Sequence, residues 1–161
     1  MQETFYMPIE ELKPREQTQV RMTVLLGIIQ QLMTTRQNRL FEGKKLTLSQ
    51  FGVLNHFTHE PDRSWTVTDL AEVMEMNQPG ITKIVTLLIN EGLLSSTPDL
   101  VDKRKRFLKI TRQGKLLCDD TFRSLLPEIS QVFGEWDDRS LKQFHQHLET
   151  LMGWLDSNRI A

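Results

Sequence analysis

A chain of 161 residues is long enough to bury one substantial hydrophobic core. Its 39% hydrophobic and 25% charged residues are typical of a globular protein, and its net charge of −1 argues against a uniformly basic nucleic-acid-binding protein. The single cysteine, Cys118, excludes an internal disulfide and is typical of a reducing compartment. The N-terminus lacks the pattern of a signal peptide, and the longest apolar run is too short to cross a membrane. We therefore expect a cytoplasmic protein with no membrane partner.

The first expected element is a long helix over about Glu16–Glu42. Apolar residues follow it in two neighbouring rows, one beginning at Met22 and the other at Val24. Such a wide apolar surface predicts burial against more than one neighbour. Gly43 follows the last residue of the pattern, as is common at the C-terminal end of a helix.

Two capping boxes predict the starts of the next two helices. Thr47 and Gln50 form the first, which opens a helix ending near His59. Thr66 and Asp69 form the second, which opens a short helix.

A further helix is expected to begin at Gln78-Pro79, because proline is tolerated in the first turn, and to end at Gly92. Only a short turn separates it from the helix before. Two helices joined in this way form a helix-turn-helix.

Strand-like runs follow over Leu93–Thr97 and Lys105–Ile110, and we interpret them as a hairpin with a charged tip. Two more helices complete the chain, over about Thr111–Glu135 and Asp138–Asn158, the second with a coiled-coil-like apolar seam. The expected fold is mainly α with a small β-hairpin wing: a winged helix-turn-helix flanked by long dimerisation helices. The expected domains are 1–45, a DNA-binding domain at 46–110, and 111–161.

The helix that begins at Gln78 has one apolar and one polar side at about 100° per residue. The expected apolar side contains Ile81, Ile84, Val85 and Leu88, and Ile89 is the one apolar residue on the polar edge. The polar side contains no acid until Glu91 and consists of side chains able to contact phosphates or base edges: Gln78, Thr82, Lys83, Thr86 and Asn90. Pro79-Gly80 lets the backbone approach a duplex closely.

Positive charge is concentrated immediately after this helix. Residues 102–112 contain six basic residues and one acid, so the rest of the chain carries a net charge of −6. Lys103, Arg104, Lys105 and Arg106 are expected to follow the DNA backbone or to enter the minor groove. Asp102 is expected to pair with Arg104 and shape the tip. Ser49 and Thr68, near helix N-termini, are expected to hold phosphates.

These segments in this order resemble the DNA-binding core of the multiple-antibiotic-resistance regulator (MarR) family. The resemblance covers LTLSQFGVL, TVTDLAEVM, QPGITKIVTLLINEGLL and the wing DLVDKRKRFLKIT, in which Asp102-Lys103-Arg104 matches the aspartate-x-arginine common in that family. Glu75 departs from the pattern, because glycine is common in that turn, and so does Pro79-Gly80, where small hydroxylated residues are common.

The resemblance implies a homodimeric repressor or activator that binds a pseudo-palindromic DNA operator, and repression is the expected direction. It also implies release by a small aromatic or phenolic effector bound between the dimerisation region and the DNA-binding lobe. By position, the candidate pocket walls are Leu25, Ile29, Met33, Phe51 and Leu54.

The sequence signals for redox, metal or catalytic sites are weaker. We expect Cys118 to pack in the core, with Asp119 and Asp120 raising its pKa. His56 and His59 share a helix face, but no cysteine is near them and we expect no metal, no cofactor and no catalytic residues. The alternative function is a winged-helix interaction module whose basic wing binds an acidic protein. The acid-free polar side of the helix from Gln78 favours DNA.

Overall fold

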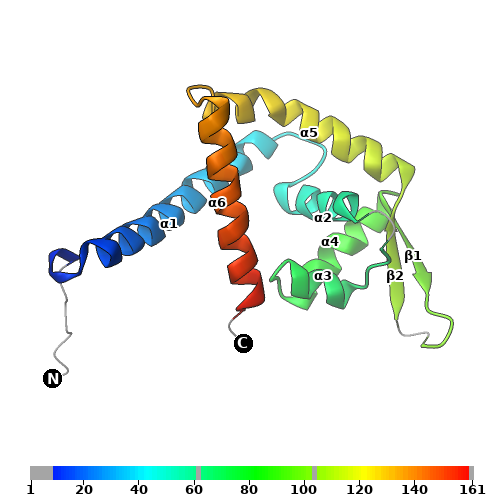
Figure 1. The fold of residues 1–161 in the computed structure, drawn as a ribbon. Helices are drawn as coiled ribbons and strands as arrows, with labels where there is room; N and C mark the ends of the chain where they lie inside the picture. Colours follow the sequence, from blue (N-terminus) through cyan, green and yellow to red (C-terminus); the bar gives the residue numbers. More distant parts are fainter. Residues whose placement is uncertain (1–8, 61–62, 103–104, 160–161) are drawn as a thin grey trace, which may run out of the picture. The chain divides into compact units, whose positions relative to one another are not determined.

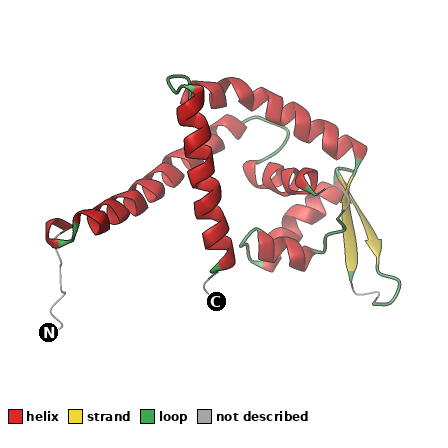
Figure 2. Cartoon of the chain, in the orientation of Figure 1, coloured by secondary structure: helices red, strands yellow, loops and turns green. Residues whose placement is uncertain are grey.

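The computed structural model describes residues 9–60, 63–102 and 105–159. The elements, shown in Figures 1 and 2, are a 3-10 turn at Ile9–Glu11, α1 (Pro14–Phe41), α2 (Leu48–His59), α3 (Val67–Val73), α4 (Gln78–Asn90), β1 (Leu94–Pro98), β2 (Arg106–Ile110), α5 (Arg112–Val132) and α6 (Asp138–Ser157). The chain forms two compact units, one ending at Leu116 and the other beginning at Leu117. The expected fold class, a mainly helical winged helix-turn-helix with long terminal helices, is confirmed. The expected domain limits at 45 and 110 stay a prediction.

The core of the first unit lies where α2, α3, α4 and the hairpin meet. Seven of its side chains are between 0% and 3% exposed: Val53, Leu54, Phe57, Leu70, Ile81, Val85 and Leu88. Trp65 is also fully buried and forms an antiparallel bridge with Leu108 of β2, so it adds a short third segment to the hairpin. Packing therefore accounts for this tryptophan.

The hairpin is antiparallel and places Leu94 opposite Ile110 and Pro98 opposite Arg106. Its strands begin one residue later than expected, and β1 extends to Pro98. A proline is acceptable at the end of a two-stranded sheet, where a missing N–H removes little pairing. The hairpin therefore keeps its expected alternation, with Leu94 and Leu108 buried.

The turn between α3 and α4 is fixed by backbone hydrogen bonds. Glu75 has a φ of 51°, the left-handed region, while its N–H donates to the Glu72 carbonyl and the Met76 N–H donates to the Ala71 carbonyl. This pair of bonds is the Schellman arrangement that ends many helices, usually with glycine at the left-handed position. Glu75 therefore adopts the conformation that glycine would take more cheaply.

Helix α1 carries a large apolar surface that the single chain leaves open. Its exposed apolar side chains are Met22, Val24, Leu25, Leu26, Ile28, Ile29, Leu32 and Met33, each between 38% and 64% exposed. Its C-terminal end packs on α2, with the Phe41 ring 5.3 Å from the Phe51 ring. A surface of this extent is far more than scattered exposed residues would give.

The second unit contains the remainder of α5 and α6. Helix α5 continues through Pro127 and ends at Val132, three residues before the expected end. An aromatic chain joins the two helices, with the Trp136 ring 6.0 Å from Phe133 and 5.2 Å from Phe144. Asp137 caps α6 by accepting a hydrogen bond from the Ser140 N–H. Across the described ranges, no helix combines the length and apolar character needed to cross a membrane.

Candidate nucleic-acid interface

Helix α4 presents the expected polar face to solvent. The five polar residues of that face are exposed, whereas Ile81, Val85 and Leu88 are buried. One detail of the expectation was wrong: Ile89 is only partly exposed, and Leu87 is the exposed apolar residue, at 43%. The helix therefore offers hydrogen-bonding groups, a lysine and one aliphatic side chain on one surface.

The first turn of α4 explains the Pro79-Gly80 pair. Asn77 caps the helix, its Oδ1 accepting a hydrogen bond of 2.8 Å from the Gly80 N–H. A Cβ on residue 80 would lie 2.9 Å from that same oxygen, closer than real Cβ contacts come. Gly80 therefore leaves room for the cap, and Pro79 gives up an N–H that the first turn does not need. The capping role of Asn77 was not predicted, although an asparagine immediately before a helical proline is a recognisable signal.

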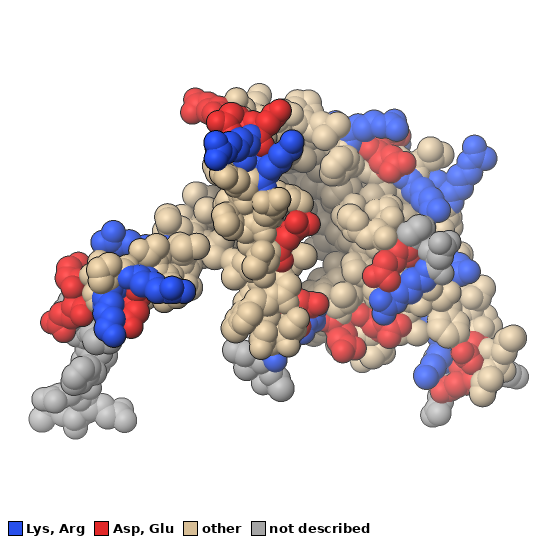
Figure 3. Space-filling model, in the orientation of Figure 1, with Lys and Arg blue, Asp and Glu red and all other residues tan. Residues whose placement is uncertain are grey.

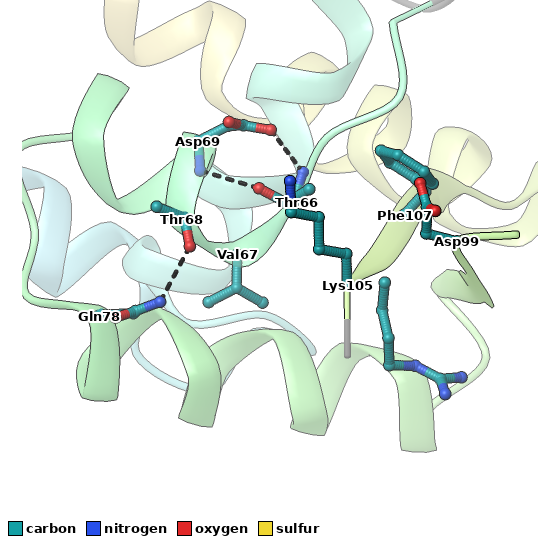
Figure 4. Close-up of a pocket in the computed structure, with 9 residues that line it drawn as sticks. Thr66, Val67, Thr68, Asp69, Gln78, Asp99, Lys105 and Phe107 are labelled. Carbon is teal, nitrogen blue, oxygen red and sulfur yellow. Dashed lines mark hydrogen bonds between the residues drawn. The ribbon is translucent and has the colours of Figure 1, made fainter. Parts of the chain in front are cut away.

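Gln78 is held by a side chain from the preceding helix. Its Nε2 donates to Thr68 Oγ1 at 3.0 Å, as Figure 4 shows. A carboxamide has two N–H groups and a carbonyl oxygen, so this bond leaves one donor and the acceptor for other partners. That pair is the set needed for bidentate contact with an adenine. Two residues expected to bind DNA separately are therefore coupled, and Thr68 orients Gln78.

The threonines of the polar face use their hydroxyl protons within the helix. Thr82 Oγ1 donates to the Gln78 carbonyl at 2.8 Å, and Thr86 Oγ1 donates to the Thr82 carbonyl at 2.7 Å. With the proton committed, each hydroxyl can accept from a ligand but not donate to it. These two side chains are therefore suited to accept a hydrogen bond or to make a methyl contact, rather than to donate to a phosphate.

A groove of about 580 Å³ lies between the start of α3, the start of α4 and the hairpin (Figure 4). It is lined by Thr66, Val67, Thr68, Asp69, Gln78, Asp99, Lys105, Arg106 and Phe107. Its walls therefore connect the first residue of α4 with the basic strand of the wing. Hydrogen bonding from Thr66 lowers the pKa of Asp69, so this carboxyl stays ionised as part of the α3 capping box.

Of the four basic wing residues, Lys105 and Arg106 lie within the described residues, and both are exposed. The Arg106 guanidinium binds across the hairpin, with Nε 2.7 Å from Ser96 Oγ and Nη2 3.3 Å from the Ser96 carbonyl. These bonds hold Arg106 along β1. Lys103 and Arg104 lie outside the described residues, and so does the expected pairing of Asp102 with Arg104.

Asp99 shapes the described part of the wing tip. Its Oδ1 accepts hydrogen bonds from the Val101 N–H at 2.7 Å and the Asp102 N–H at 2.8 Å. The Asp99 N–H donates to the Lys105 carbonyl, and the Lys105 N–H donates to the Asp102 carbonyl. The bonds from Asp102 and Val101 lower the pKa of Asp99, which keeps the carboxylate ionised. Sequence reasoning missed this residue, although Pro-Asp is a common turn signal.

The remaining expected DNA contacts lie at helix starts. Ser49 is exposed in the first turn of α2, whose capping box between Thr47 and Gln50 is confirmed. Thr68 is the second residue of α3 and is also exposed. Both positions suit contact with a phosphate, and both roles stay predictions.

The residues expected to form an effector pocket have different environments. Leu25, Ile29 and Met33 are 44% to 56% exposed on α1, Phe51 is partly exposed, and Leu54 is fully buried in the core. A cavity of about 310 Å³ beside α1 includes one of the five, Leu25, together with Ile9, Arg21 and Val24. The five-residue pocket stays a prediction.

The surroundings of Cys118 and His56 indicate packing roles for both side chains. Cys118 is 2% exposed, and burial, followed by the nearby Asp119, raises the pKa of its thiol to about 11. The thiol is therefore a poor nucleophile. The His56 ring packs edge-on against Trp65 with ring centres 4.4 Å apart. Among the described residues, no three histidine, cysteine, aspartate or glutamate side chains are grouped as a metal site.

The chain thus combines a helix-turn-helix, whose second helix exposes a polar face, with a basic hairpin that follows it. This combination defines a winged helix-turn-helix protein. The sequence model of the MarR family matches residues 44–105, which contain this entire unit up to the start of β2. Over these residues the chain is similar to the MarR family.

Solved structures with this fold include a mutant of MarR from E. coli, which has a TM-score of 0.70 and 17% sequence identity over 88% of this chain and 98% of that chain. They also include the regulator BldR from Sulfolobus solfataricus, with a TM-score of 0.69 and 18% identity over 88% of this chain and 99% of that one.

Curated relatives are more similar in sequence than these solved structures, but the segments that match are shorter. The transcriptional regulator AdcR of Streptococcus pyogenes is 29% identical over 52% of this chain and 64% of its own length. The transcriptional repressor YetL of Bacillus subtilis is 25% identical over 69% of this chain and 66% of its own length. The chain therefore spans about two thirds of the length of these two relatives.

Proposed function

We propose that this protein is a DNA-binding transcriptional regulator that acts as a homodimer. The observation that carries the proposal is the solvent-exposed face of α4, which contains Lys83 and four uncharged polar side chains and has no acid before Glu91. An ordinary solvated helix face has no need to exclude acids. A face that contacts a polyanion does, since a carboxylate against phosphate is repelled.

In the proposed complex, α4 enters the major groove with its N-terminal residues towards the bases. Gln78, oriented by Thr68, offers its remaining N–H and its carbonyl to a base edge. Lys83 neutralises a phosphate or contacts a base, while the hairpin follows the backbone with Lys105. Figure 3 shows lysine and arginine side chains over the hairpin and the start of α5, among acids and uncharged residues.

Dimerisation would cover the apolar surface of α1. Two copies related by a two-fold axis would place their α4 helices in successive major grooves, about 34 Å apart. The exposed apolar residues of α6, which include Met152 and Trp154 at 65% and 62%, are further candidates for this interface.

Repression is the proposed direction of regulation, by analogy with YetL, which is named as a repressor. Solved structures of MarR with operator DNA and of MepR with DNA share the fold of this chain, with TM-scores of 0.64 in each case. We further propose release by a small aromatic or phenolic effector, which would have to bind one separation of the two DNA-binding lobes better than the other.

The test is fluorescence anisotropy of a labelled mixed-sequence duplex at several salt concentrations. We expect affinity to fall steeply with salt, because phosphate neutralisation releases counterions. Lys83→Ala should reduce the log–log salt slope by about one, and so should Arg104→Ala if the wing binds phosphate. Lys142→Ala, on exposed α6, is the charge-matched control and should leave the slope unchanged. Absence of binding at low salt would refute the proposal and favour the interaction module with an acidic protein partner.

A further inference from the structure

The wing ends in two aliphatic side chains that the fold leaves entirely in water. Leu100 is 98% exposed and Val101 is 94% exposed. The other large apolar side chains described as exposed lie on helices or, in the case of Trp136, in the turn between α5 and α6, and the highest value among them is 65%. Turn tips normally carry polar or small residues, because nothing in the fold can cover an apolar side chain there. This pair therefore lacks a role in the packing of its own chain.

Hydrogen bonds among the described residues order the backbone around this pair. The Asp99 carboxylate accepts from the N–H groups of Val101 and Asp102, and two further bonds join Asp99 and Asp102 to the backbone of Lys105. Four hydrogen bonds thus close the base of the loop on either side of Leu100. Preorganised apolar groups lose little conformational freedom when a partner buries them. This ordering therefore favours a binding role for the pair.

The surroundings of the pair indicate what the partner is. Lys105 and Arg106 follow it on the same hairpin, and the groove lined by Asp99, Lys105 and Gln78 connects the wing to the start of α4. The tip is therefore continuous with the proposed DNA interface. The minor groove of DNA, about 6 Å wide, combines anionic edges with walls formed by deoxyribose, and apolar side chains are known minor-groove contacts. In Figure 3 the described end of the hairpin shows acidic, basic and uncharged surface together.

We propose that Leu100 and Val101 enter the minor groove beside the major groove read by α4, and that they select A·T pairs there. The proposal rests on the proposed function. The floor of the groove at an A·T pair is free of the amino group that guanine projects into it. Two aliphatic side chains fill that space and displace water, whereas at a G·C pair they would collide with the amino group and leave it without a hydrogen-bond partner.

The test uses a duplex selected by the wild-type protein from a random pool, and the same duplex with 2,6-diaminopurine in place of adenine. Diaminopurine adds the minor-groove amino group and leaves the major-groove edge unaltered. The variant Leu100→Ser/Val101→Ser removes the apolar surface at exposed positions, and Leu100→Met/Val101→Ile is the matched control that keeps it. Thermal denaturation of both variants should equal that of the wild type.

We expect the serine variant to bind the selected duplex about tenfold more weakly with an unchanged salt slope, because apolar burial is lost and phosphate contacts are kept. The methionine–isoleucine control should bind like the wild type. Diaminopurine should weaken the wild type strongly and the serine variant little. Equal binding by wild type and serine variant, or an equal diaminopurine penalty in both, overturns the proposal while leaving the proposed function intact. A wild-type protein that selects no duplex at all refutes both.

Discussion

Gly114, in the first turn of α5, is the position where a single methyl group should do the most damage. A Cβ there would lie 2.2 Å from the Leu93 carbonyl oxygen and 2.9 Å from Ile110 Cγ1. Carbon and oxygen in contact normally lie about 3.3–3.6 Å apart, so the backbone would have to move by roughly 1 Å. The Leu93 carbonyl cannot move freely, because it accepts hydrogen bonds from the backbone N–H and the hydroxyl of Thr111.

The expected cost of Gly114→Ala follows from these contacts. Overpacking costs about 1–3 kcal/mol, and weakening the partly buried bonds to the Leu93 carbonyl adds about 1–3 kcal/mol. Alanine recovers about 1 kcal/mol of helix propensity. The net loss should be about 1–5 kcal/mol, a large part of the roughly 5–15 kcal/mol that stabilises a domain.

Urea denaturation followed by circular dichroism measures this loss as a lower midpoint. The matched control is Gly52→Ala in α2, where the nearest atom to a new Cβ is Met74 Cε at 3.8 Å, an ordinary contact. That variant should gain about 0.5–1 kcal/mol from helix propensity alone. If Gly114→Ala unfolded at the same urea concentration as the wild type, the close packing of the Leu93 backbone against the first turn of α5 would be contradicted.

Variants at three more positions test the local structure. Glu75→Gly should raise the free energy of unfolding by about 0.5–1 kcal/mol, since it relieves a left-handed φ of 51°, and Glu75→Val should lower it in the same urea assay. Thr66→Val should cost about 1–2 kcal/mol, because it removes the cap on the Asp69 N–H, and an unchanged midpoint would contradict the capping box. Burial lowers the pKa of His56, so the unfolded chain binds the proton first and stability should fall as pH drops through about 6.5. His56→Leu should flatten that pH dependence, which thermal melts between pH 5 and pH 8 would show.

The fold could be predicted because its local signals agree with one another. Thr47 and Thr66 begin helices through capping boxes, and Gly92 ends α4 with the left-handed φ that glycine takes freely. Each signal acts within four residues, so it can be read without knowing the tertiary structure. The end of α5 at Val132 was harder to predict, because Gly134 beyond it lacks the left-handed φ of a capping glycine.

The details of the site depended on contacts between distant residues. The bond from Gln78 to Thr68 spans ten positions, and the bonds from Arg106 to Ser96 cross the hairpin. A helical wheel places Leu87 and Ile89 on either edge of α4, but only the packing of neighbouring elements decides which one is covered. The role of Asp99 at the tip was local enough to be found, since Pro-Asp is a turn signal that can be read from the sequence.

The anchoring of α4 limits how this protein can be regulated. At its start, Asn77 binds the Gly80 N–H and Thr68 binds Gln78; at its end, the Leu93 N–H donates to the Leu88 carbonyl at 2.8 Å. Moving α4 against its own lobe would break these bonds and open the core around Ile81 and Val85. The free energy of binding one small molecule rarely compensates for such a cost. In the proposed dimer, an effector should therefore change the separation of two intact lobes. Amide hydrogen exchange tests this argument: an effector that lowered DNA affinity should leave the protection of α4 unchanged, and loss of that protection would mean that the recognition helix itself is the switch.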